Sequence, residues 1–193
     1  MALFNNIRLR IAGYILQKGI TSLKRNKKLV SLNTAGSVGL LFELTDHSVY
    51  YAIQDFFQKL QENKIKVKAL GYSGTKNATS QFLPVLSFDF ISGKDLNWLL
   101  IPKAKCVTDF IETDFDICIN IASEDIFPLK YIAGMSKAKL KAGAYNNVAA
   151  DDNFKALSQI YDIMLKSEPI HNQISFLGII NEYLSILNSK GNV

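Results

Sequence analysis

Short apolar runs that alternate along the chain with segments of helical period predict an α/β protein. The runs are nearly continuous in apolar residues, which is typical of parallel strands covered by helices on both faces. Strands that alternate with helices also imply right-handed crossovers. The predicted fold class is therefore a three-layer Rossmann-like sandwich with a mainly parallel sheet, preceded by an N-terminal amphipathic helix.

Five strands are expected, at residues 37–44, 65–72, 85–91, 116–122 and 140–145. Lys66 and Lys68 alternate with apolar residues, which favours a position nearer an edge for the second strand. Two segments leave alternatives open. Residues 93–101 fit a short strand or a helical turn, and residues 160–166 fit a last strand or a helical stretch.

Helices are expected at residues 49–63, 103–112, 123–134 and 173–187, where apolar residues recur at steps of three and four. Asp46 or Ser48 can cap the first of these helices. A further helix begins near Leu3, and Gly19 is expected to end it.

The positive charge of the chain is concentrated at its N-terminus. The sequence has 22 Lys and Arg against 17 Asp and Glu, but its first acidic residue is Glu43. Seven cations precede it: Arg8, Arg10, Lys18, Lys24, Arg25, Lys27 and Lys28. We therefore divide the chain into a basic amphipathic helix with its connector, residues 1–33, and a Rossmann-like α/β domain, residues 34–193.

The basic helix leaves two alternatives open. It either packs its apolar side on the domain, or it lies on an anionic membrane surface through the seven cations. Nucleic acid is not expected as a partner, because no helix-turn-helix, zinc-finger or aromatic-plus-basic strand pattern is present. A signal peptide fits poorly, and no apolar run approaches the ~18 residues of a transmembrane helix. We expect a cytoplasmic protein, with the inner membrane as the alternative place for the helix.

A polar rim is predicted where the strands end, because ligands of such folds bind outside the carboxyl ends of the strands. This candidate site for a small polar ligand consists of His47, Ser48, Tyr72, Ser73, Asp89, Ser123, Glu124 and Tyr145. Structural explanations compete with this interpretation. Ser48 and Ser123 are natural helix caps, and a lone His such as His47 is commonly a hydrogen-bonded surface group.

The sequence predicts no catalytic residue, cofactor or metal site. The turn at residues 44–48 has no Gly, so neither a dinucleotide fingerprint nor a P-loop is present, and no Gly-x-Ser-x-Gly elbow exists. Cys118 lies in an apolar strand, and Cys106 has no neighbouring His to activate it. Two Cys exclude both a disulfide framework and a four-thiolate zinc site.

Residues 116–145, DICINIASEDIFPLKYIAGMSKAKLKAGAY, have the form strand, acidic turn, helix and short strand. Together with the segment Asp95-Leu-Asn-Trp98 and the basic N-terminal helix, this resembles an uncharacterised Bacteroidota family known as a domain of unknown function. The same unit is similar, less closely, to the N-terminal Rossmann-like half of GT-B lipopolysaccharide heptosyltransferases. That resemblance implies an acceptor site on this half, with the nucleotide-sugar held mainly by a second half.

The leading hypothesis is a protein of unknown function that works as a non-catalytic Rossmann-like binding or interaction domain. One alternative is a degenerate or partner-dependent glycosyltransferase-like domain with an acceptor pocket at the strand ends. The other is a peripheral membrane protein held by the basic N-terminal helix. Whether the protein is an enzyme stays open, although the lack of a catalytic motif favours a non-enzyme.

Overall fold

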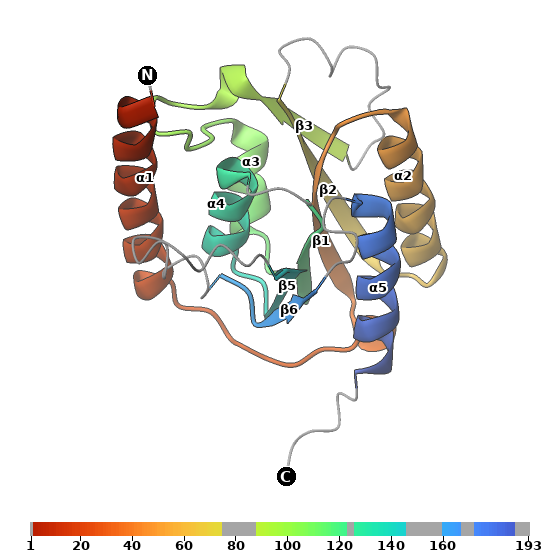
Figure 1. Ribbon diagram of the computed structural model, residues 1–193. Helices are drawn as coiled ribbons and strands as arrows, with labels where there is room; N and C mark the ends of the chain where they lie inside the picture. Colours follow the sequence, from red (N-terminus) through yellow and green to blue (C-terminus); the bar gives the residue numbers. More distant parts are fainter. Residues whose placement is uncertain (1, 75–87, 123–125, 146–159, 167–171, 188–193) are drawn as a thin grey trace.

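The computed structural model describes residues 2–74, 88–122, 126–145, 160–166 and 172–187. Its sheet has six strands, all parallel, in the order β3-β2-β1-β4-β5-β6. The first strand, β1, thus lies in the middle of the sheet. The chain adds β2 and β3 on one side of it, and then β4, β5 and β6 on the other side (Figure 1). The predicted α/β class and the mainly parallel sheet are confirmed.

The strands are short and largely buried, as their apolar runs predict. Their bounds are β1 (Ser37–Glu43), β2 (Lys66–Ser73), β3 (Phe88–Ser92), β4 (Ile117–Asn120), β5 (Leu140–Ala144) and β6 (Ile163–Leu165). The ambiguous segment at residues 160–166 contains a strand, β6. The other ambiguous segment forms a 3-10 turn, η3 (Gly93–Asp95), followed by an isolated bridge between Leu96 and Pro102.

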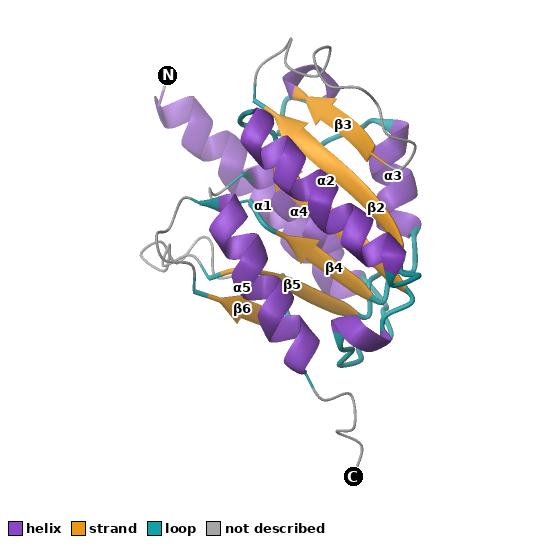
Figure 2. Ribbon diagram, turned by 90° about the vertical axis from the view of Figure 1, so that its right-hand side faces the viewer, coloured by secondary structure: helices purple, strands orange, loops and turns teal. Residues whose placement is uncertain are grey.

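Helices cover both faces of the sheet. On one face lie α2 (His47–Glu62) and α5 (Gln173–Ile186), which are drawn in front of the strands in Figure 2. On the other face lie α3 (Lys105–Glu112) and α4 (Phe127–Met135). Each face has its own hydrophobic cluster, and Phe88 and Phe57 are packed edge to face in the first one, with ring centroids 4.8 Å apart. This is the predicted three-layer arrangement.

The N-terminal helix α1 (Ala2–Ser22) packs on α4, so it forms an additional layer at one side of the molecule (Figure 1). Its contact side is apolar, since Ala12 and Leu16 are fully buried. A Cβ added to Gly134 of α4 would lie 2.8 Å from Leu16 Cδ1. The two helices therefore approach closely because α4 offers a glycine at the crossing.

Gly19 does not end α1, so this expectation was wrong. The helix continues to Ser22, and Gly19 lies against α4, where an added Cβ would be 2.5 Å from Met135 Sδ. The residue serves close packing between helices rather than a helix stop.

The connector between α1 and the sheet is bound to the domain by hydrogen bonds. Lys28 N donates to Lys139 O at 3.1 Å, and Arg25 Nη1 donates to Ala138 O at 3.0 Å. Further along, Ser31 caps a 3-10 turn, η1 (Leu32–Thr34), and its hydroxyl donates to Leu184 O of α5 at 3.2 Å. The connector is thus bound both to the segment between α4 and β5 and to α5, while the proposed boundary at residue 33 stays a prediction.

Candidate functional site

The order of the strands reverses between β1 and β4, so the topological switch point lies between the carboxyl ends of these two strands. Two residues of the predicted rim lie just after β1. His47 begins α2, and the Ser48 amide donates to the carboxylate of the N-cap residue Asp46 at 2.7 Å. The hydrogen bond from the Ser48 hydroxyl, and next that from Val49 N, lowers the pKa of Asp46 below its ordinary value. Of the two expected caps, Asp46 is the N-cap of α2, whereas Ser48 lies in the first turn and donates to it.

Tyr72 and Ser73 end β2, beside the end of β1, and Leu44 N donates to Tyr72 O at 2.8 Å. Ser73 is fully buried. Burial, followed by the nearby charge of Glu43, raises the pKa of the Tyr72 phenol. The structure therefore puts both residues at the carboxyl end of the sheet, but Tyr72 packs against the cluster on the α3 and α4 face, opposite the face that α2 covers.

The remaining rim residues are not all at this edge. Asp89 is the second residue of β3, where its carboxylate is 3.5 Å from Lys68 Nζ, and β3 ends only at Ser92. Tyr145 follows β5 and is half-exposed. Ser123 and Glu124 lie outside the described residues.

Two buried amides outside the predicted rim, Gln173 and Asn120, occupy the switch point. The Gln173 side chain at the start of α5 accepts from Glu43 N at 2.9 Å and donates to Glu43 O at 3.0 Å. On β4, Asn120 donates to the Tyr161 hydroxyl at 2.6 Å and accepts from Ala122 N at 3.1 Å. Both side-chain amides are therefore hydrogen-bonded to other groups of the protein. The only sequence signal for Asn120 was one amide in an otherwise apolar strand.

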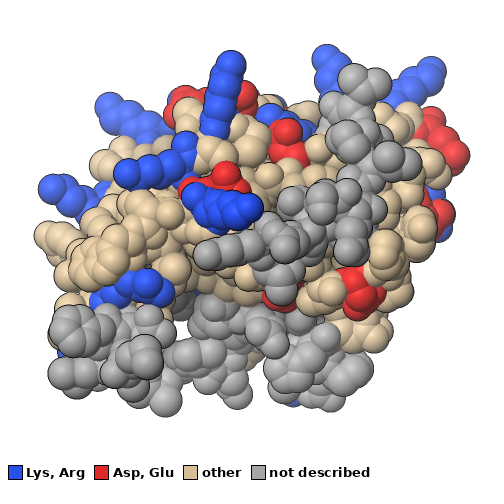
Figure 3. Space-filling model, turned by 90° about the horizontal axis from the view of Figure 1, so that it is seen from above, with Lys and Arg blue, Asp and Glu red and all other residues tan. Residues whose placement is uncertain are grey.

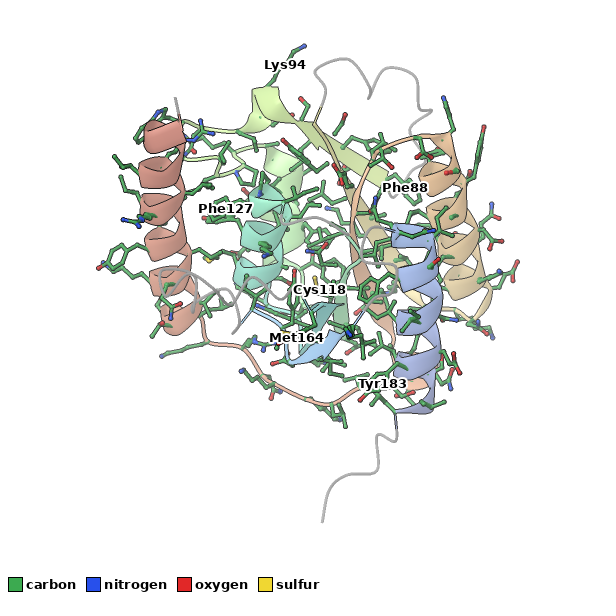
Figure 4. All side chains as sticks on the ribbon, in the orientation of Figure 1. Phe88, Lys94, Cys118, Phe127, Met164 and Tyr183 are labelled. Atoms are coloured by element: carbon green, nitrogen blue, oxygen red, sulfur yellow. The ribbon has the colours of Figure 1, made fainter. Side chains whose placement is uncertain are left out.

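A second group of buried polar residues lies under α4. Lys141 of β5 is 2% exposed, and its Nζ donates to Gly134 O near the end of α4 at 2.7 Å. Burial, and next the charge of Arg25, lowers the pKa of Lys141 to about 8. Cys118 is the register partner of Lys141 on β4 and lies at the centre of the molecule (Figure 4). Burial raises the pKa of its thiol to about 11, so the thiolate is scarce at neutral pH.

The third candidate is the outward side of α1. Four large apolar side chains are exposed there: Ile7 (48%), Ile11 (41%), Tyr14 (70%) and Ile15 (37%). They recur at steps of three and four and therefore form one row along the helix. We call these four residues, together with the exposed cations Arg10 and Lys18, the outward face of α1.

The seven predicted anion contacts separate into two groups. Arg10, Lys18, Lys24, Lys27 and Lys28 are exposed. In the view from above, Lys and Arg side chains project from the α1 side of the molecule and also from the opposite side (Figure 3). Arg8 is half-buried, and its Nε has no hydrogen-bond partner. Arg25 is ion-paired with Asp162, with 6% of its side chain exposed, and is therefore committed to the domain.

Away from these three candidates, a hollow of about 580 Å³ opens between the C-terminal ends of α2 and α5, where Lys59, Glu62 and Asn181 line it. Among the described residues, no cluster of three or more His, Cys, Asp or Glu is placed to hold a metal ion. The same part of the chain contains no helix with the length and hydropathy needed to cross a bilayer.

Comparison with curated proteins finds no match. A family model, described as a family of unknown function (DUF6913), matches residues 8–187. This range includes most of α1, the whole sheet and α5. The chain therefore belongs to the DUF6913 family of unknown function.

Proposed function

We propose that this protein is a non-catalytic peripheral membrane protein, which binds an anionic bilayer through the outward face of α1. One observation supports the proposal. The helix already buries an apolar side against α4, yet it exposes a second apolar row at Ile7, Ile11, Tyr14 and Ile15. A helix that only packs on its domain needs no second apolar side.

The positive charges on α1 indicate which kind of partner covers this apolar row. Arg10 and Lys18 are exposed beside it, and the chain has no acidic residue before Glu43. A second copy of α1 would bring cations against cations without a counter-charge. An anionic lipid surface supplies both the apolar depth and the opposite charge.

The expected strength of binding follows from these groups. A half-exposed isoleucine contributes about 1 kcal/mol when it leaves water, and each cation near an anionic leaflet contributes about 1 kcal/mol. The outward face as a whole then supplies roughly 6 kcal/mol, comparable to one myristoyl chain. Binding by α1 alone is therefore reversible and weakens with salt.

Sedimentation with lipid vesicles tests the proposal on the full chain. We expect binding to phosphatidylcholine vesicles that contain phosphatidylglycerol, little binding to phosphatidylcholine alone, and loss of binding at high NaCl. The double variant I7S/I11S should bind at least about tenfold more weakly. The matched control is I179S/I186S, which removes two exposed isoleucines from α5. Equal binding by the two double variants, or no binding by the wild type, overturns the proposal.

A glycosyltransferase-like acceptor domain is the second candidate, and the strand order β3-β2-β1-β4-β5-β6, with its switch point, supports it. The small polar ligand would lie beside Tyr72 and the start of α2. A thermal-shift screen with sugar phosphates and sugar nucleotides tests it, since a ligand at 100 times its Kd stabilises a protein by about 2.7 kcal/mol. No shift with any of them rejects this candidate.

The location follows from the first proposal. We place the protein in the cytoplasm, with α1 on the inner face of an anionic membrane, and the family resemblance suggests a Bacteroidota source. Cell fractionation tests the location, because a reversibly bound protein leaves the membrane fraction when it is washed with high salt.

A further inference from the structure

The segment between η3 and α3 presents a single exposed tryptophan. Trp98 is the one tryptophan of the chain, and 64% of it is exposed. A tryptophan in water leaves a large apolar ring unburied, although its N–H suits a boundary between water and lipid. The exposure of this ring is significant only if the loop that carries it is ordered.

The loop is tightly closed around Asn97. Asn97 N donates to Ile101 O at 2.9 Å, and Leu100 N donates to Asn97 O at 3.0 Å. The Asn97 side-chain oxygen accepts from Leu99 N and Ile101 N, each at 2.9 Å. The base is closed by the hydrogen bond from Lys103 N to Asp95 O at 2.8 Å. Trp98 therefore lies at the tip of an ordered turn.

The turn also contains backbone strain. Leu100 has a φ of 61°, in the left-handed region that a non-glycine residue adopts at a cost of about 1 kcal/mol. Leu99, Leu100 and Ile101 pack against the hydrophobic cluster under α4. Three apolar side chains of the turn therefore pack against the body, while Trp98 is exposed to solvent.

This turn and α1 share one side of the molecule. Leu9 of α1 packs against the same hydrophobic cluster as Leu99 and Ile101. In Figure 1 the segment after η3 runs toward the upper end of α1 before it returns to α3. Exposed cations accompany the turn as well, namely Lys94, Lys103 and Lys105, and Lys94 projects away from the body (Figure 4).

We infer that Trp98 is a second membrane anchor, which inserts at the lipid–water boundary of the same anionic bilayer that α1 contacts. The inference rests on the proposed function and extends its surface from one helix to two elements. Stable attachment takes two weak signals rather than one, and an aromatic ring beside basic residues is the kind of group that supplies the second. The nearby lysines favour an anionic lipid surface over a neutral partner.

Because Trp98 is the one tryptophan, its fluorescence reports on this site alone. The full chain is mixed with phosphatidylglycerol-containing vesicles, with and without brominated acyl chains, and sedimentation is measured on the same samples. We expect bound protein to show a blue-shifted emission that brominated lipid quenches. The variant W98A should bind about tenfold more weakly, whereas W98Y, which keeps an aromatic ring with a polar end, should retain most of the binding.

Two adverse results are distinguishable. Bound protein whose Trp98 emission neither shifts nor is quenched overturns the second anchor and leaves α1 as the membrane contact. Failure of the wild type to sediment with the vesicles overturns the proposed function and this inference together.

Discussion

Arg25 and Asp162 lie 137 residues apart in the sequence and form an ion pair that attaches the α1 connector to the end of the sheet. The same carboxylate accepts from Lys141 N at 2.9 Å, so one aspartate holds both the connector and β5. Burial alone would raise the pKa of Asp162, but the hydrogen bonds from Arg25 and from Lys141 N lower it below its ordinary value. The stability that this carboxylate contributes is therefore present above pH ~3.9 and lost as the pH falls further.

Removing the Asp162 charge should destabilise the protein. D162N leaves the nearly buried Arg25 guanidinium without its counter-charge, and we expect a loss of about 2 kcal/mol in the free energy of unfolding, between the values for exposed and buried pairs. Urea unfolding measures it. The matched control is D55N, which breaks the exposed Lys59–Asp55 pair and should cost at most about 0.5 kcal/mol. Equal losses would contradict a structural role for the Arg25 pair.

Lys141 predicts a second pH dependence of the same sign, at alkaline rather than acidic pH. Its pKa is about 8 in the folded chain, while an unfolded lysine titrates near 10.4. Between these values the unfolded chain binds more protons, so stability rises with pH, by about 3 kcal/mol over the full window. The raised pKa of Cys118 lowers stability over much of the same range in both proteins, so the contribution of Lys141 is read from the difference between wild type and K141M. We expect the stability of the wild type relative to K141M to rise by this amount between these pH values. K94M, at a residue that projects into solvent (Figure 4), is expected to behave as the wild type does.

The crossing of α1 and α4 requires Gly134. The branched side chain of G134V would meet Leu16 and Ile20, and overpacking of this kind costs about 1–3 kcal/mol. G13A provides the comparison. A Cβ at Gly13 meets nothing within 4 Å, so the better helix propensity of alanine should raise stability by about 1 kcal/mol. Thermal unfolding should therefore move in opposite directions for the two variants, and a shared direction would contradict the crossing.

The Gln173 side chain makes two hydrogen bonds to the Glu43 backbone at the switch point. Q173A leaves a buried donor and a buried acceptor unpaired, and we expect a loss of about 2 kcal/mol in the free energy of unfolding. Q58A, at an exposed position on α2, should change stability by less than about 0.5 kcal/mol. A loss as small as that of Q58A would show that water replaces these bonds.

The fold could be predicted because its signals are local. Strands such as Ser37–Glu43 are continuous apolar runs, and α2 shows its period and its Asp46 cap within one short segment. The order of the strands and the contact of Gln173 with Glu43 could not be predicted. Both depend on residues far apart in the chain. Gln173 and Glu43 are 130 positions apart, and nothing in the sequence near one of them indicates the other.

The candidate surface was predicted only in part, for a physical reason. Helix α1 has apolar residues on both sides, with Ala12 and Leu16 inward and Ile11 and Tyr14 outward. Hydrophobic period alone cannot decide which side meets the domain. The small residues decide it, because Gly19 and Gly134 allow close contact between helices. The burial of Lys141 could not be predicted, because a lysine in a short strand suggests a solvent-facing position. The packing of α4 over the strand buries it.

The depth of α1 in a bilayer tests the proposed membrane contact most directly. Nitroxide labels are placed at Y14C on α1 and at Y51C on α2, two exposed tyrosine positions, in a C106S background. On phosphatidylglycerol-containing vesicles, the label at position 14 should gain contact with oxygen and lose contact with a water-soluble nickel chelate, while the label at position 51 stays in water. Labels that both remain in water on vesicle-bound protein would contradict the proposed membrane contact of α1.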